Sequence, residues 1–128
     1  MYNERDIQDM VEAFRKAMRE NNLPVCDCFK IAATLPAPRF YTSPMQAYRI
    51  VSRMHRGLPV RIENELKKEM YREIYRRWVE SGSTTYATLK DIIEQPAPRF
   101  YIAESTFTTV VYRELRKNSK KKYDKTGS

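Results

Sequence analysis

The chain has very few of the residues that make tight turns. It contains three glycines, Gly57, Gly82 and Gly127, in 128 residues. Sheets joined by tight hairpins need glycine repeatedly, because glycine adopts positive φ angles without steric cost. The scarcity of glycine therefore argues against a β-rich fold. A hydrophobic content of 41% and a charged content of 31% suit a folded, highly charged protein.

Histidine and cysteine are also scarce, since the chain has only His55, Cys26 and Cys28. A zinc site needs about four ligands, and a disulfide between cysteines one residue apart would be strained. We therefore expect reduced thiols, no metal and no cofactor. Nucleophilic catalysis needs clustered reactive groups, and phosphate-binding loops need closely spaced glycines. The sequence offers neither pattern, so we expect a protein that is not an enzyme.

Long apolar segments are missing as well. No run approaches the roughly 20 residues that span a bilayer, and the first residues lack a signal-peptide pattern. Together with the unpaired cysteines, this predicts a cytoplasmic protein with no membrane partner.

Positive charge, in contrast, is abundant and unevenly distributed. The net charge is +8. Five arginines and no acidic residue lie between Arg39 and Arg61, and seven Lys or Arg residues oppose two acidic ones in 113–128. Nucleic acid is the commonest partner of such basic blocks, and an acidic protein surface is the second.

Each basic block follows or overlaps a copy of the same hexapeptide, Pro-Ala-Pro-Arg-Phe-Tyr, at 36–41 and again at 96–101. An ungapped comparison of 1–60 with 61–120 gives twelve identities, six of them in the hexapeptide. The duplication predicts two tri-helical repeats, 1–60 and 61–117, followed by a basic, disordered tail at 118–128.

Apolar residues recur at helical spacing three times in each repeat. The first repeat predicts helices at 3–20 (with Ile7, Met10, Val11, Phe14 and Met18 inward), at 27–34, and from Pro44 to the stop at Gly57. The second predicts helices at 62–80, 86–94 and 104–117. Ser43 and Pro44 are typical of a helix start.

A unit of this size buries too little surface to be stable alone. We therefore expect the repeats to share an interface through Trp78, Tyr71 and Tyr75. The predicted fold is all-α, with six helices forming two tandem helix-turn-helix-like repeats in one compact body.

The third helix of each repeat carries a row of long or polar side chains opposite its buried stripe. In the first repeat the row is Gln46, Arg49, Arg53 and Arg56; in the second it is Thr106, Thr109, Arg113 and Arg116, extended by Lys117, Lys120, Lys121 and Lys122. Arginine and glutamine reach base edges, and lysine neutralises phosphate. The rows indicate recognition helices, although any solvated helix face can carry arginine. The turn is also longer than in most helix-turn-helix proteins.

The hexapeptide itself supports two interpretations. Its prolines end one helix and stiffen the chain before the next, and we expect Phe40 and Phe100 in the core. Arg39 and Arg99 either turn back to the end of the short helix, where a cation is favoured, or contact phosphate. The sequence leaves both roles open.

The hexapeptide, followed by a small capping residue and a helix with Ala47, Ile50 and Val51, resembles a motif of small PAPRFY proteins from phages and mobile elements of gut Bacteroidetes. The resemblance implies a phage-infected bacterial cytoplasm or a virion-associated role, and no particular activity. The residues predict a non-enzymatic protein that binds double-stranded DNA. The alternative is a phage structural or host-interaction protein whose basic surface binds an acidic protein.

Overall fold

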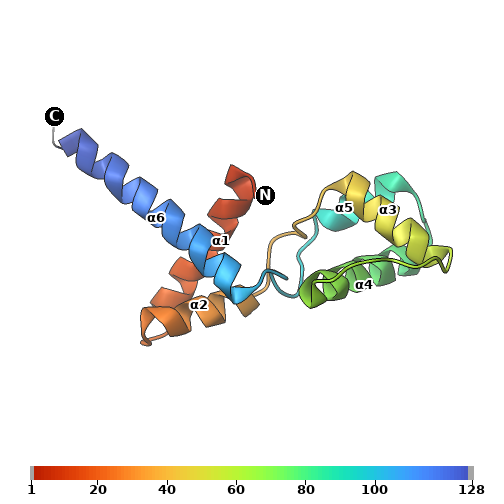
Figure 1. The fold of residues 1–128 in the computed structure, drawn as a ribbon, viewed down its shortest axis with the longest axis horizontal. Coiled ribbons are helices and arrows are strands. Elements are labelled where there is room, and N and C mark those ends of the chain that lie inside the picture. Colours follow the sequence, from red (N-terminus) through yellow and green to blue (C-terminus); the bar gives the residue numbers. More distant parts are fainter. Residues whose placement is uncertain (1, 127–128) are drawn as a thin grey trace. The chain divides into compact units, whose positions relative to one another are not determined.

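The computed structural model describes the backbone of residues 2–126 and the side chains of residues 2–119. Its helices are α1 (Glu4–Glu20), α2 (Val25–Thr34), α3 (Pro44–His55), α4 (Glu65–Glu80), α5 (Tyr86–Ile93) and α6 (Glu104–Thr126), as shown in Figure 1. The described residues contain no strand, which confirms the predicted all-α class with six helices. In this part of the chain no helix is long and apolar enough to cross a membrane.

The helix boundaries follow local capping chemistry. The Asn3 side chain accepts from the Asp6 backbone N–H at 2.8 Å to begin α1. Ser43 Oγ accepts from the Gln46 N–H at 3.2 Å, and Pro44 occupies the first turn of α3, as predicted. These side chains satisfy backbone donors that have no partner within the helix.

The six helices form two units, and the division is not the one that the sequence predicts. The terminal unit comprises Met1–Leu35 and Ile102–Ser128, and the central unit comprises Pro36–Tyr101. Helices α1 and α2 therefore pack with α6, and α4 and α5 pack with α3 (Figure 1). Each unit takes its third helix from the other repeat, whereas the duplication in the sequence predicts that 1–60 and 61–117 form separate units.

Proline explains this exchange of third helices. Leu35, just after α2, has an extended backbone (φ −68°, ψ 155°), and Pro36 and Pro38 follow it. Both prolines lack an N–H and restrict φ, so the connection stays extended instead of turning back. The third helix is thereby carried away from the two helices that precede it in its own repeat.

In the terminal unit, α1 supplies a buried face of Met10, Val11 and Phe14. Phe14 stacks on Phe29 of α2, with ring centroids 4.2 Å apart. Ala13 and Ala17 complete this face, whereas Met18, which was expected inside, is 41% exposed. The small alanine side chains allow α1 to approach its neighbours closely, and they shift the buried stripe away from Met18.

The last helix is longer than predicted. It continues through Thr126, past the expected end at Lys117, so that 118–126 are helical rather than disordered. No proline or glycine lies between Pro98 and Gly127 to stop it, and lysine is a good helix former. The predicted tail residues 127–128 lie outside the described residues.

In the central unit the two hexapeptides lie antiparallel and pair with each other. The Ala37 N–H donates to the Ala97 carbonyl at 3.0 Å, and the Ala97 N–H donates to the Ala37 carbonyl at 2.8 Å. Phe40 stacks with Tyr101 at 6.2 Å between centroids, and Phe100 stacks with Tyr41 at 5.6 Å. Both phenylalanines are buried, as predicted. The repeated motif is thus its own binding partner.

Arg77 of α4 holds both hexapeptides. Its guanidinium carbon lies 5.0 Å from the centre of the Phe40 ring, and its Nη1 donates to the Pro96 carbonyl at 2.9 Å. Glu73 accepts from Arg77 Nε at 3.1 Å and orients the side chain. The equivalent position in the first repeat is Ala17, so this contact has no second copy.

The aromatic residues expected between the repeats do contact the first repeat. The Tyr71 hydroxyl lies 2.8 Å from Thr42 Oγ1, and the Tyr75 hydroxyl lies 3.3 Å from His55 Nδ1. The Trp78 ring packs edge-on against Tyr48, with centroids 6.0 Å apart. All three residues of α4 meet side chains that precede residue 60, but these contacts lie inside the central unit and do not form the predicted interface between two separately packed repeats.

The exchange can be tested by a double-mutant cycle on Thr42→Val and Tyr71→Phe. If each repeat packed on its own third helix, Thr42 would face Val11 instead of the Tyr71 hydroxyl. We expect a coupling free energy of about 0.5–1.5 kcal/mol in urea unfolding. The same Thr42→Val change combined with Tyr112→Phe, at an exposed tyrosine of α6, should be additive. Additivity of the first pair would contradict the exchanged arrangement.

Glu73 should make stability depend on acid pH. Hydrogen bonds from Arg76, and then from Arg77, lower the pKa of Glu73 below its usual 4.5. A lowered folded-state pKa stabilises the protein above the unfolded value, and that stability is lost as pH falls through the folded value. We expect Glu73→Gln to cost about 1 kcal/mol at pH 7 and much less near pH 3. Chemical unfolding across this range measures the difference.

Glu69→Gln is a suitable control for that measurement, because Glu69 is an exposed carboxylate on the same helix. Its substitution should leave the acid dependence of the free energy of unfolding as in the unmodified protein. An equal loss of stability for Glu73→Gln at pH 7 and pH 3 would exclude a role for its charged form.

Candidate nucleic-acid interface

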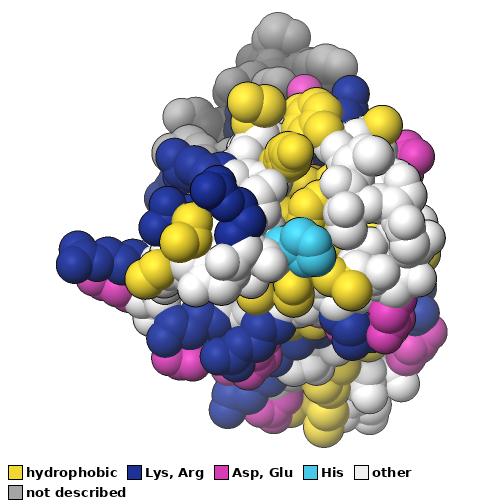
Figure 2. Space-filling view, turned by 90° about the vertical axis from the view of Figure 1, so that its right-hand side faces the viewer, with side chains coloured by type: hydrophobic (Ala, Val, Ile, Leu, Met, Phe, Trp, Pro, Cys, Tyr) yellow, Lys and Arg dark blue, Asp and Glu magenta, His cyan; other side chains and the backbone are white. Residues whose placement is uncertain are grey.

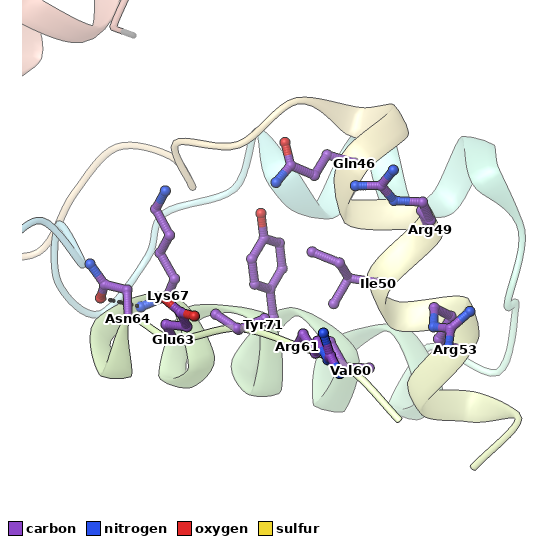
Figure 3. A pocket seen from close by; sticks show the side chains of 11 residues that line it. Gln46, Arg49, Ile50, Arg53, Val60, Arg61, Glu63, Asn64, Lys67 and Tyr71 are labelled. Carbon is purple, nitrogen blue, oxygen red and sulfur yellow. Dashed lines mark hydrogen bonds between the residues drawn. The ribbon is translucent and has the colours of Figure 1, made fainter. Parts of the chain in front are cut away.

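A basic groove of about 590 Å³ lies in the central unit between α3, α4 and the segment that joins them. We call this segment, residues 57–64, the strap. Figure 3 shows the side chains of Lys67 and Tyr71 pointing from α4 to the side on which α3 lies. Helix α3 contributes Gln46, Arg49 and Arg53 to the groove. The groove is lined by Gln46, Arg49, Ile50, Arg53, Val60, Arg61, Ile62, Glu63, Asn64, Lys67 and Tyr71. Three members of the predicted α3 row therefore share one concave site.

Charge in the groove is strongly positive. Arg49, Arg53, Arg61 and Lys67 oppose only Glu63 among the lining residues. A concave basic surface concentrates anions near it, because the cations add their fields while the protein walls exclude water. Such a groove suits a phosphate-bearing ligand.

The strap owes its course to the end of α3. Gly57 has a φ of 70°, a left-handed conformation that strongly favours glycine. The Leu58 N–H donates to the Arg53 carbonyl at 2.9 Å, which closes the helix end. Arg53 Nε also donates to the Pro59 carbonyl at 3.0 Å. One arginine therefore both lines the groove and secures its wall.

The strap then runs back alongside α4 to the first turn of that helix (Figure 1). Asn64 Oδ1 accepts from the Lys67 N–H at 3.1 Å, which begins α4 at Glu65 rather than near Ile62 as predicted. Residues 62–64 therefore belong to the groove wall and not to the helix.

Tyr71 forms part of the floor of the groove. Its side chain is buried, and burial raises the pKa of its phenol, an effect that the Thr42 hydrogen bond and nearby Arg49 partly offset. The phenol is therefore neutral at physiological pH and supplies an apolar surface with one bonded hydroxyl. Ile50, Val60 and Ile62 add further apolar lining to the groove.

The α6 row lies on the terminal unit. Thr109, Arg113 and Arg116 line a shallow hollow of about 440 Å³ together with Thr108 and Tyr112. The hollow is formed by α6 alone, and Tyr112 is 56% exposed. Thr106 and Lys117 are exposed but do not line it. The side chains of Lys120, Lys121 and Lys122 lie outside the described residues.

The two hexapeptide arginines have different surroundings. Arg39 Nη1 forms an ion pair with Glu94, which ends α5, at 3.1 Å. Arg99 lies over the Tyr101 ring at 5.9 Å, and its buried Nε has no hydrogen-bond partner in the described part of the chain. Arg39 therefore meets the end of the short helix of the other repeat, through a side-chain carboxylate and not through the carbonyls that end α2 as expected. The phosphate role of both arginines stays a prediction. Arg56 ends α3 and is exposed outside the groove.

The face that carries the histidine has a different character (Figure 2). Hydrophobic side chains lie above and below the imidazole in this view, and Lys and Arg side chains gather to its left. His55 packs against Tyr75 and edge-on against Trp78, with centroids 6.1 and 5.8 Å apart. This histidine therefore belongs to an aromatic cluster. Among the described residues, no group of three His, Cys, Asp or Glu side chains could hold a metal ion.

Sequence reasoning missed Arg61, Lys67 and Tyr112 as site residues. Arg61 and Lys67 belong to the second repeat, but they line the groove together with the α3 row of the first repeat. This neighbourhood arises only because the third helices are exchanged between the repeats. The preference of Asn64 for a helix start would have revealed the strap. Tyr112 has no such sequence signal, since only its exposure distinguishes it.

No family model, no curated protein and no solved structure matches this chain.

Proposed function

We propose that this chain is a non-enzymatic protein that binds double-stranded DNA through the basic groove of the central unit and the α6 row of the terminal unit. The observation that carries the proposal is the groove, which is lined by four cations from three segments and by a single carboxylate. The net charge of +8 favours the same class of partner.

The side chains of both surfaces suit DNA. Phosphate oxygens accept hydrogen bonds from arginine, lysine, asparagine, glutamine and threonine side chains. The two surfaces offer these donors while making few internal ion pairs. No ion pair within the described residues engages Arg49, Arg61, Arg113 or Arg116. Their charges can therefore neutralise phosphate without first breaking a contact in the protein.

The repeat architecture is consistent with this proposal. In each unit a long helix and a short helix support a third helix that carries the basic row. The resemblance of the hexapeptide region to phage and mobile-element proteins suggests a regulator of such an element as the biological setting.

One observation favours a second candidate, an acidic protein partner. The lining of the groove is partly apolar, since Ile50, Val60 and Tyr71 contribute to it beside the cations. A partner segment that alternates acidic and hydrophobic residues could bury its apolar side chains in the groove while its carboxylates pair with the arginine and lysine side chains that line it. A phage structural or host-interaction protein would use the groove in this way.

Binding to a random duplex of about 30 base pairs across a salt series tests the proposal. Counterions released from DNA make the affinity fall steeply with salt, with a logarithmic slope of about 0.9 per neutralised phosphate. We expect the double variant Arg49→Ala/Arg61→Ala, which removes two cations of the groove, to bind more weakly at low salt, with a slope shallower by about 2. Arg53 is left intact because it secures the strap.

The matched control removes the same charge elsewhere. Lys16→Ala/Arg19→Ala, at exposed positions of α1, should retain the affinity and the slope of the unmodified protein. An equal loss in both double variants would mean that net charge alone acts. Absence of duplex binding at low salt would reject the DNA proposal in favour of a protein partner.

A further inference from the structure

We infer that the two basic surfaces have different tasks: the groove grips a sugar–phosphate backbone without regard to sequence, and α6 alone reads base edges in the major groove. This inference rests on the proposed binding of DNA and assigns the specificity within it. It separates two rows that look equivalent in the sequence.

Space excludes the α3 row from the major groove. The major groove of B-DNA is about 12 Å wide, and an α-helix with its side chains is about 10–12 Å across. A reading helix therefore occupies the whole width. Strap residues Val60–Asn64 line the same cavity as Gln46, Arg49 and Arg53, so the strap borders the face that would have to enter. A helix and a strap together are too wide for deep insertion.

The chemistry of the groove suits phosphate rather than bases. A phosphate can be neutralised by a cation from many directions, whereas a base edge needs donors in a fixed plane. Arg53 already donates its Nε to the Pro59 carbonyl, which reduces its capacity for bidentate base contact. Arg61 and Lys67 reach the groove from the strap and from α4, so the cations of the groove come from three segments instead of lying along one helix.

The α6 row meets the opposite conditions. Thr109, Arg113 and Arg116 are spaced by four and three residues on one exposed face, and only α6 residues line their hollow. The position equivalent to Gly57 is Lys117, so no left-handed residue stops the helix there and no strap folds back. Tyr112, 56% exposed beside the two arginines, adds an aromatic surface that can contact a base or a thymine methyl group.

Charge-conserving substitutions of the full-length protein distinguish the two tasks. Lysine keeps the charge of arginine but loses the planar fork that reads guanine. The unmodified protein is first used to select preferred duplexes from a randomised pool. The affinities for a selected and a scrambled duplex are then compared for Arg49→Lys, Arg113→Lys and the uncharged double variant Arg61→Ala/Lys67→Ala. Thermal unfolding confirms that each variant is folded.

We expect Arg49→Lys to preserve the affinity ratio between the two duplexes. Arg61→Ala/Lys67→Ala should weaken binding to both duplexes by the same factor and make the salt slope shallower by about 2. Arg113→Lys should reduce the ratio by about 5- to 150-fold, the discrimination carried by one bidentate contact, and leave the salt slope unchanged.

The outcomes separate this inference from the proposed function. If the groove variants change the ratio, or if Arg113→Lys leaves it intact, the assignment of tasks is wrong although DNA binding stands. Selection of no preferred duplex would also overturn the assignment, because no row would then read bases. Failure to bind any duplex would instead reject the proposed function itself.

Discussion

The pairing of the hexapeptide with its own second copy is the constraint on which the central unit depends. Two backbone hydrogen bonds join Ala37 and Ala97, and two aromatic stacks close around them. Burying the two phenylalanines contributes about 1.5–3 kcal/mol each, and each aromatic contact adds about 0.5–1.5 kcal/mol. A substitution in one copy removes a partner from the other. The identity of the two segments therefore has a structural cause, since both sides of one contact are made from the same six residues.

The exchange of third helices also explains where the candidate site comes from. The groove combines the row of α3, from the first repeat, with Lys67 and Tyr71 of α4, from the second. Neither repeat contains the groove by itself. The Thr42–Tyr71 hydrogen bond ties the start of α3 to α4 just beneath it, so the architecture that buries the aromatic side chains also positions the cations.

Local features could be predicted from the sequence, and the partnership of the helices could not. The helices of the first repeat were found to within a few residues, because periodicity and capping act over one or two turns. Whether α3 or α6 packs on α1 depends on small differences in packing free energy, because both helices present a similar buried stripe. Val51 of α3, for example, is equivalent to Val111 of α6, and both are buried. The helical spacing of the arginines predicted the cationic rows. Arg61 and Lys67, in contrast, line the groove only because the third helices are exchanged. Periodicity specifies which face of a helix is buried without specifying its partner.

The differences between the repeats are concentrated where they affect surfaces and connections. Gly57 ends α3 and starts the strap, whereas Lys117 lets α6 continue. Glu94 gives Arg39 a carboxylate, whereas the equivalent position is Thr34. The buried stripes and the hexapeptides, in contrast, keep the same character. The duplicated units thus keep the same core but differ at their helix ends. As a result, their two basic surfaces differ in shape: one is concave, and the other is an open helix face. For the proposed binding of DNA, unlike shapes favour an asymmetric target, because equal tasks would have required equal surfaces.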